Sequence, residues 1–314
     1  MKKRGRNMRY RRSIYRKNGI HVYFLITAGI LVAVVLLFVL LGNALGDKTA
    51  KTESERNAAA STDPTASEHV TPRNVSAYPI QLSADGSSLK SRISQAVDLG
   101  YTEVCFDLDT KTGTLSYLSD IAVSLGYISS DANLWKLNDA IALFDDSNLY
   151  TIGITHLSRM NTENDLDRQV ASGYYTARIA EALRCGVDDV LILYDNLSMN
   201  TLSEITAIAD KVHLLCPDST LGISVTPDIL SSEEGGTLVD ALWNSFDYIS
   251  VSLDQEPAEG ENLSQTAERQ LGGMLYYLLR YNMRVLIPNV DAESITQIKE
   301  AISANGVKNM LILP

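Results

Sequence analysis

The sequence predicts an α/β fold, a (β/α)8 or TIM barrel, and three observations support this prediction. Strand-like and helix-like segments alternate from residue 78 onward, which implies parallel strands joined by helical crossovers. Eight such strands fall within 237 residues, near the roughly 250 residues typical of this barrel. Neither G-x-G-x-x-G nor G-x-x-x-x-G-K-[ST] occurs, which disfavours the alternative, a doubly wound open sheet that binds nucleotides.

The expected strands are short apolar runs, rich in β-branched residues and bounded by polar or glycine-containing turns. The run TEVCFDLD is the clearest, because apolar residues are followed by two aspartates at its end. In chain order the expected strands are residues 78–83, 102–109, 149–157, 187–195, 220–227, 246–254, 283–290 and 307–314.

The expected helices lie between the strands and carry apolar residues at helical spacing, as at positions 89, 93, 97 and 99. Gly186 ends one of them and Pro217 stops the next. In chain order the helices are residues 88–99, 117–125, 133–144, 167–183, 202–215, 236–245, 264–281 and 292–304. The sequence ends with the eighth strand, so we expect either a barrel without its last helix or a seam covered by an earlier helix.

The N-terminal part predicts a membrane anchor. Residues 1–21 contain nine Lys and Arg and no acidic residue, and 22–41 are 20 uncharged, mostly apolar positions, enough to cross a hydrocarbon core of about 30 Å. A cleaved signal peptide is the alternative, with a shorter expected apolar region. We predict a basic cytoplasmic tail (1–21), a transmembrane helix (22–41), a flexible polar linker (42–77) and an extracytoplasmic barrel (78–314).

Charge and cysteine content narrow the function classes. The net charge is −11, and without the nine basic residues of the tail 18 basic residues face 38 acidic ones, which disfavours nucleic-acid binding. The three cysteines, Cys105, Cys185 and Cys216, form no C-x-x-C motif. We expect three buried thiols, with one disulfide and a spare thiol as the alternative.

Polar residues stand at most of the predicted C-terminal strand ends, where barrels carry their functional side chains. Asp107 and Asp109 share the strand parity of Cys105, and the neighbouring apolar positions face outward, so we expect Asp107 to face the barrel interior. Aspartate also caps helices, which is the competing interpretation for Asp228 and Asp254. Other polar residues at these ends are His156, Tyr194, Asp195, Thr226, Glu256, Asn289 and Asp291.

The segment EVCFDLDTKTGTLSYLSDIAVSLG resembles a family of bacterial, envelope-associated glycoside hydrolase domains with a TIM-barrel fold. Asp107 matches the aspartate at the end of the family's second strand, Gly113 its glycine and Tyr117 its tyrosine. LNDAIALFDDSNLYTIGITHLSR and FDYISVSLD are similar to later parts of the family. The resemblance extends over residues 78–314 and implies an activity on cell-wall or extracellular glycans. We expect no cofactor, and although the acidic residues at the strand ends could hold a calcium ion, no ligand spacing in the sequence predicts a metal site.

The sequence departs from this family at three positions, which makes it a divergent member. Ile154 stands where the family has an arginine, Leu193 where it has an aspartate, and Thr226 where it has a further aspartate. An inward leucine cannot transfer a proton, and Asp195 is the residue that could replace the missing carboxylate. The resemblance therefore implies the fold more firmly than the chemistry.

Two hypotheses follow. In the first, the barrel hydrolyses a glycan with Asp107 paired to Asp195 or Asp254, since glycosidases need two carboxyl groups about 5 to 9.5 Å apart. In the second, a non-catalytic barrel binds glycans or an envelope protein partner. The candidate substrate contacts are Asp109, Tyr117, His156, Tyr194, Asp228 and Asn289.

Overall fold

The structure is a computed structural model that describes residues 77–82, 86–131, 133–253, 261–287 and 292–313. The predicted tail, transmembrane helix and most of the linker lie outside these ranges. Within the described ranges, no helix is both long enough and apolar enough to span a bilayer. Residues Glu68–Pro314 form one compact unit.

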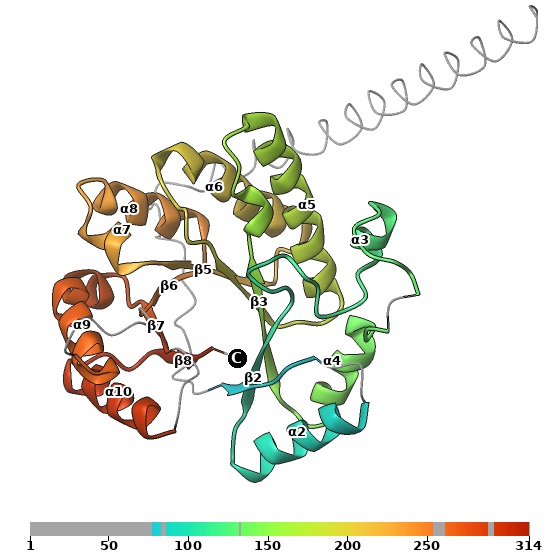
Figure 1. Cartoon of the computed structure of the whole chain (residues 1–314), viewed down its shortest axis with the longest axis horizontal. Coiled ribbons are helices and arrows are strands. Elements are labelled where there is room, and N and C mark those ends of the chain that lie inside the picture. Colours follow the sequence, from blue (N-terminus) through green and yellow to red (C-terminus); the bar gives the residue numbers. More distant parts are fainter. Residues whose placement is uncertain (1–76, 83–85, 132, 254–260, 288–291, 314) are drawn as a thin grey trace, which may run out of the picture. The chain divides into compact units, whose positions relative to one another are not determined.

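The described residues contain eight parallel strands in one sheet, and each strand pairs with its neighbours in the sequence. Sequential order excludes the doubly wound alternative, in which the strand order reverses within the sheet. The helices surround the strands (Figure 1), and the fold is a (β/α)8 barrel, as predicted. The strands are β1 Tyr78–Pro79, β2 Glu103–Asp107, β3 Tyr150–His156, β4 Asp189–Leu193, β5 Thr220–Val225, β6 Tyr248–Ser252, β7 Arg284–Ile287 and β8 Met310–Ile312.

The two ends of the sheet come together near β1. The Cys105 thiol on β2 donates to the backbone oxygen of Ile312 on β8 at 3.1 Å. Each strand from β1 to β8 pairs with the next one through backbone hydrogen bonds. β1 is the shortest strand and has two residues. The barrel is therefore nearly closed, and its seam lies beside its shortest strand.

The helices confirm the predicted alternation, with bounds that shift by a few residues. One short helix, α7, was not expected; it begins at Pro227, whose fixed φ suits the first turn of a helix. The helices are α2 Gly86–Asp98, α3 Asp120–Ser124, α4 Leu137–Asp145, α5 Asp165–Arg184, α6 Met199–Leu215, α7 Pro227–Ser231, α8 Gly235–Ser245, α9 Leu263–Arg280 and α10 Ala292–Ala304, with a 3-10 turn, η1, at Ser158–Met160.

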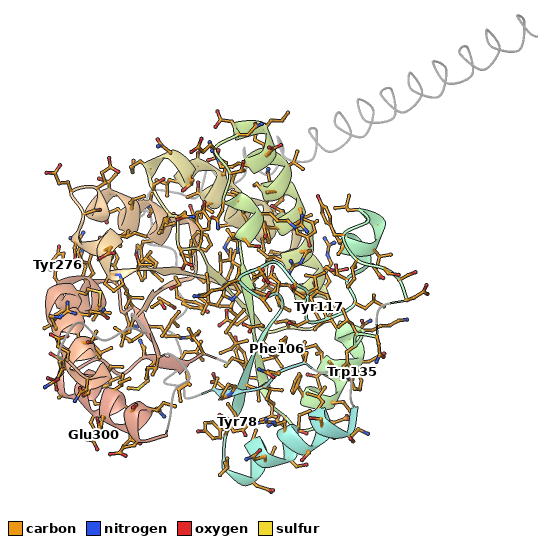
Figure 2. All side chains as sticks on the ribbon, viewed as in Figure 1. Tyr78, Phe106, Tyr117, Trp135, Tyr276 and Glu300 are labelled. Atoms are coloured by element: carbon orange, nitrogen blue, oxygen red, sulfur yellow. The ribbon has the colours of Figure 1, made fainter. Side chains whose placement is uncertain are left out.

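Hydrophobic residues form two cores, one between the strands and the helices and one inside the barrel. Val104 and Phe106 belong to the outer core, and Cys105 belongs to the inner one. Phe106 lies well inside the molecule, while Tyr276 and Glu300 lie at its periphery (Figure 2). Val104 and Phe106 on β2 thus face outward and Cys105 faces inward, as predicted.

The N-terminal end of the barrel interior is filled by a polar cluster. Tyr248 pairs with Gly222 in the β5–β6 register, and its ring occupies the space that a side chain at residue 222 would need. The Tyr248 hydroxyl donates to both carboxylate oxygens of Asp189, at 2.9 and 3.0 Å. The Arg284 guanidinium lies 3.6 Å from Asp189 and over the tyrosine ring. These side chains fill the N-terminal end of the barrel interior, so space for a pocket remains at the C-terminal end.

The cysteines are free, and no disulfide joins them. Cys105 is buried, as expected, whereas Cys185 and Cys216 are only partly buried. The disulfide alternative is therefore wrong for this structure.

Candidate functional site

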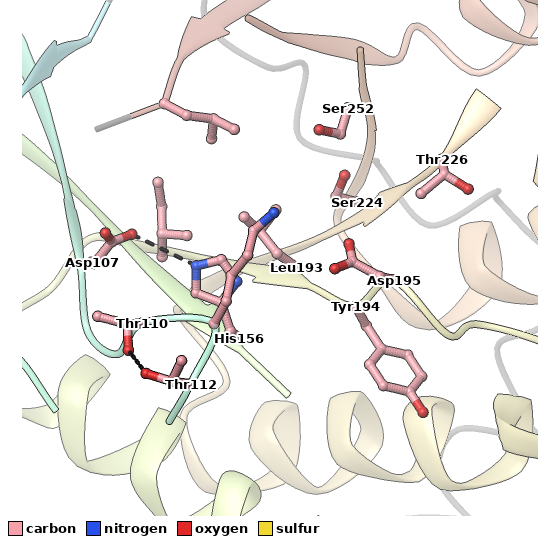
Figure 3. Close-up of a pocket in the computed structure, with 13 residues that line it drawn as sticks. Asp107, Thr110, Thr112, His156, Leu193, Tyr194, Asp195, Ser224, Thr226 and Ser252 are labelled. Carbon is pink, nitrogen blue, oxygen red and sulfur yellow. Dashed lines mark hydrogen bonds and ion pairs between the residues drawn. The ribbon is translucent and has the colours of Figure 1, made fainter. Parts of the chain in front are cut away.

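A pocket of about 460 Å³ opens at the C-terminal end of the strands. Its walls come from β2 to β6, the loop that follows β2, and the residue after β8 (Figure 3). This is the end at which barrel enzymes carry their active sites. The lining residues are Asp107, Thr110, Lys111, Thr112, Ile154, His156, Leu193, Tyr194, Asp195, Ser224, Thr226, Ser252 and Leu313.

Asp107 and His156 form a polar pair on one wall of the pocket. They are the last residues of β2 and β3, and strand parity directs both inward. His156 Nε2 lies 3.8 Å from Asp107 Oδ1, and the Asp107 side chain is 34% exposed. An exposed carboxylate beside an imidazole can accept hydrogen bonds from a ligand while the imidazole donates or accepts.

Asp195 lies on the other side of the pocket from Asp107, where Ser224 and Thr226 also lie (Figure 3). It follows β4 and is exposed. Among the described residues, the pocket therefore contains two carboxylates, Asp107 and Asp195, one on each side.

The positions between these carboxylates are mostly apolar. Ile154 is fully buried, Leu193 is partly exposed, and both line the pocket together with Leu313. Leu193 and Ile154 occupy the inward positions at which the family resemblance implies an aspartate and an arginine. Neither of these two side chains can donate or accept a proton.

Asp109 does not line the pocket, although we predicted a substrate contact. It is fully buried, and its carboxylate accepts hydrogen bonds from Arg178 Nη1 at 2.8 Å, the Thr155 hydroxyl at 3.1 Å and the His156 amide at 2.6 Å. The strand ends at Asp107, and after it the alternation of faces no longer holds. Asp109 thus positions the backbone of His156, and its carboxylate oxygens already accept hydrogen bonds from other residues of the protein.

Tyr117, which we also predicted to contact the substrate, does not line the pocket. It is 1% exposed, and its hydroxyl donates to Glu181 on α5 at 3.0 Å. The same carboxylate accepts from the Ser119 hydroxyl and the Ile121 amide. Tyr117 therefore ties the segment around α3 to α5, away from the pocket.

Tyr194 and Asp228 are two further candidate contacts. Tyr194 lines the pocket, but its ring points away from Asp107 and His156 (Figure 3), and its hydroxyl donates to the Met160 backbone oxygen at 3.5 Å. Asp228 is exposed in the first turn of α7 and is absent from the pocket lining, and the N-cap residue of this helix is Thr226. Asp254 and Asn289 lie outside the described residues.

Several pocket residues were not among our candidates. Ser224 and Ser252 share the inward parity of their strands, so alternation could have revealed them, whereas Thr110, Lys111 and Thr112 belong to a loop whose path the sequence does not specify. Across the described part of the chain, no group of three His, Cys, Asp or Glu side chains is arranged to hold a metal ion.

The thiol of Cys105 lies in the inner core behind the pocket. Burial and the nearby charge of Asp107 raise its pKa well above the ordinary thiol value. The protonated thiol donates to a backbone oxygen, so Cys105 contributes packing and not a nucleophile.

The chain was compared with family models, curated proteins and solved structures. No family model matches it, and no curated protein matches it. The spore cortex-lytic enzyme SleL of Bacillus cereus superposes with a TM-score of 0.49 at 11% identity, over 76% of this chain and 69% of SleL. An alpha-amylase from Geobacillus thermoleovorans gives 0.48 at 8% identity, over 78% and 71%, and Thermotoga maritima Cel5A gives 0.48 at 10%, over 75% and 89%.

At these identities and TM-scores, both the fold and any function have to be argued from the chain's own strand order and site. The fold and the pocket define this chain as a (β/α)8 barrel with a mixed polar and apolar pocket at the C-terminal ends of its strands.

Proposed function

We propose that the barrel binds a polysaccharide or cell-wall glycan in the pocket at the C-terminal ends of its strands. The observation that carries the proposal is the composition of this pocket: Asp107, His156 and Asp195 stand around a surface formed by Ile154 and Leu193. Sugars present hydroxyl groups together with apolar C–H faces, and such a mixed lining matches both. The resemblance of EVCFDLDTKTGTLSY to glycoside hydrolase domains supports the same ligand class.

We propose further that this pocket binds the glycan without cutting it by the usual pair of carboxylates. Leu193 replaces the inward aspartate that the resemblance implies, and the nearest alternative, Asp195, is an exposed residue beyond the strand end. Hydrolysis needs one carboxyl group to protonate the leaving oxygen and a second to assist water or to form the covalent intermediate.

Hydrolysis is the second candidate function, and one observation favours it. Asp107 and Asp195 lie on opposite sides of the same pocket (Figure 3), which is where an acid and a base of a glycosidase would stand. In that case Asp195 acts from the rim in place of the residue at position 193.

The site of action follows from the sequence outside the described residues. We propose that residues 22–41 anchor the protein in the cell membrane, with the basic tail (1–21) inside and the barrel outside. An envelope glycan, or an envelope protein partner, would then lie within reach of the linker (42–77). Protease digestion of intact cells tests this topology: loss of the barrel with retention of the tail supports it, and a protected barrel contradicts it.

The function is tested with the full chain in a detergent that has no sugar headgroup. A panel of cell-wall and plant-type oligosaccharides is assayed for binding by calorimetry and for new reducing ends. Binding without new reducing ends supports the proposal. Reducing ends that disappear in Asp107→Asn support hydrolysis instead, and a panel without any binder contradicts both.

A further inference from the structure

A second pocket of about 450 Å³ lies beside the first one. Thr112 lines both pockets, so only the loop after β2 separates them. The second pocket is lined by Thr112, Gly113, Thr114, Leu115, Tyr127, Ile128, Asn133, Leu134, Arg159 and Tyr174. Apart from Thr112, none of these residues lines the first pocket.

The threonine loop between the pockets has a defined shape. The hydroxyl groups of Thr110, Thr112 and Thr114 are joined in sequence at 2.9 and 3.3 Å. Gly113 has a φ of +80°, and a side chain there would meet the Ser158 hydroxyl at 2.9 Å. The loop therefore packs directly on η1, which carries Arg159, and this packing places the threonine hydroxyls and the arginine at one pocket.

Arg159 is the cation of the second pocket. Its guanidinium carbon lies 4.0 Å from the centre of the Tyr127 ring and 5.5 Å from that of Tyr174. The two rings meet edge to face at 5.0 Å. The backbone amide of Arg159 donates to the Tyr175 hydroxyl at 3.0 Å, so both ends of the residue are held.

The charge of Arg159 has no carboxylate partner within the described ranges. Eight close pairs of basic and acidic side chains occur there, two of them histidine–aspartate pairs, and none includes this arginine. Arg159 is also exposed. A guanidinium placed over an aromatic ring can still form two parallel hydrogen bonds with a carboxylate through its N–H groups.

We propose that the second pocket binds the carboxylate of an acidic sugar, with Arg159 as the contacting cation and Tyr127 as the surface that orients it. The sugar belongs to the same glycan chain whose neighbouring unit occupies the first pocket, because the two pockets share Thr112. This inference rests on the proposed function and adds a preference for acidic over neutral glycans. Lys111, in the first pocket, places a second cation beside the same loop.

Two kinds of acidic sugar share this chemistry, a uronic acid and a sugar carrying a lactyl ether. Each has a neutral partner of nearly the same shape. Trigalacturonate is compared with its methyl ester, and the disaccharide of N-acetylglucosamine and N-acetylmuramic acid is compared with chitobiose. The four affinities are measured by calorimetry with the full chain, for the native protein and for Arg159→Gln.

In at least one pair, we expect the native protein to bind the acidic member more tightly by about fivefold, as a partly exposed charged hydrogen bond allows. Arg159→Gln should bring the ratio of the two affinities to about one. Arg184→Gln is the matched control, since it removes the same charge from the C-terminal end of α5, and it should keep the preference. Tyr127→Leu, which retains the arginine but not its support, should reduce the preference.

Equal binding of the acidic and neutral members in both pairs overturns the inference but leaves the proposed function intact. A preference that survives Arg159→Gln also overturns it. If none of the four sugars binds, this inference fails, while the wider oligosaccharide panel still decides the proposed function.

Discussion

Arg178 Nη1 on α5 donates to Asp109 Oδ2 at 2.8 Å, and both side chains are almost completely buried. Asp107, two residues earlier, remains partly exposed in the pocket. The two aspartates of FDLD, which look equivalent in the sequence, therefore have different roles: one holds the barrel to a helix and the other is available to a ligand.

We expect Asp109→Asn to destabilise the fold by about 3 to 5 kcal/mol, because it leaves the buried charge of Arg178 without its carboxylate. Asp107→Asn should change the free energy of unfolding by less than about 1 kcal/mol, since its partner His156 is only in loose contact. Denaturant titration of both variants measures the difference. Similar losses of stability would contradict the distinct roles of the two aspartates.

Gly222→Ala should be strongly destabilising. A Cβ atom at this position would lie 2.1 Å from Cζ of Tyr248, whose ring is held by Asp189 and Arg284. Overpacking of this kind costs about 1 to 3 kcal/mol or more. Gly173→Ala is the control, because Gly173 lies on an exposed part of α5 and no atom lies within 4 Å of the new methyl group. Alanine has the higher helix propensity, so this variant should be more stable by up to about 1 kcal/mol. Melting temperatures that shift equally would contradict this account of the barrel interior.

The polar cluster inside the barrel predicts a dependence of stability on pH. Burial raises the pKa of Asp189 from 3.8 to about 6, although Arg284 and the Tyr248 hydroxyl oppose the shift. Between these two values the folded state retains a proton that the unfolded state releases. The contribution of Asp189 to stability is therefore present below about pH 4 and is lost as the pH rises toward 6.

This contribution is measured as a difference between the native protein and Asp189→Asn. The free energy of unfolding of the native protein, relative to that of the variant, should fall by about 2 to 3 kcal/mol between pH 4 and 6.5. The variant loses the charged partner of Arg284 and is expected to be less stable at every pH. The test is therefore the slope of the free energy of unfolding against pH, and not its absolute value. Parallel pH profiles would show that Asp189 is ionised throughout.

The strands could be predicted because successive side chains of a barrel strand face alternately outward and inward, which gives the sequence a period of two. Val104, Cys105 and Phe106 alternate between the two cores as expected. The same rule gave the inward position of Asp107. It failed for Asp109, because β2 ends at Asp107 and the Asp109 carboxylate instead accepts hydrogen bonds from Thr155 and His156 on β3.

The contacts that the sequence did not predict join distant parts of the chain. Arg178 lies 69 residues from Asp109, and Glu181 lies 64 residues from Tyr117. No local pattern relates such residues, so Tyr117 could be taken for a ligand contact on the basis of the resemblance. Arg159 was not a candidate, because its role depends on a loop and a tyrosine that only the fold brings together.

The most direct test of the glycan-binding pocket compares two aspartates at strand ends. The affinity of the best oligosaccharide from the panel is measured by calorimetry for the native full chain, Asp107→Asn and Asp228→Asn. Asp228 is exposed and outside the pocket lining, so its variant should bind like the native protein. Asp107→Asn should weaken binding about tenfold, as expected for a lost hydrogen bond to a charged group. Equal affinity of all three proteins would contradict the assignment of the glycan to this pocket.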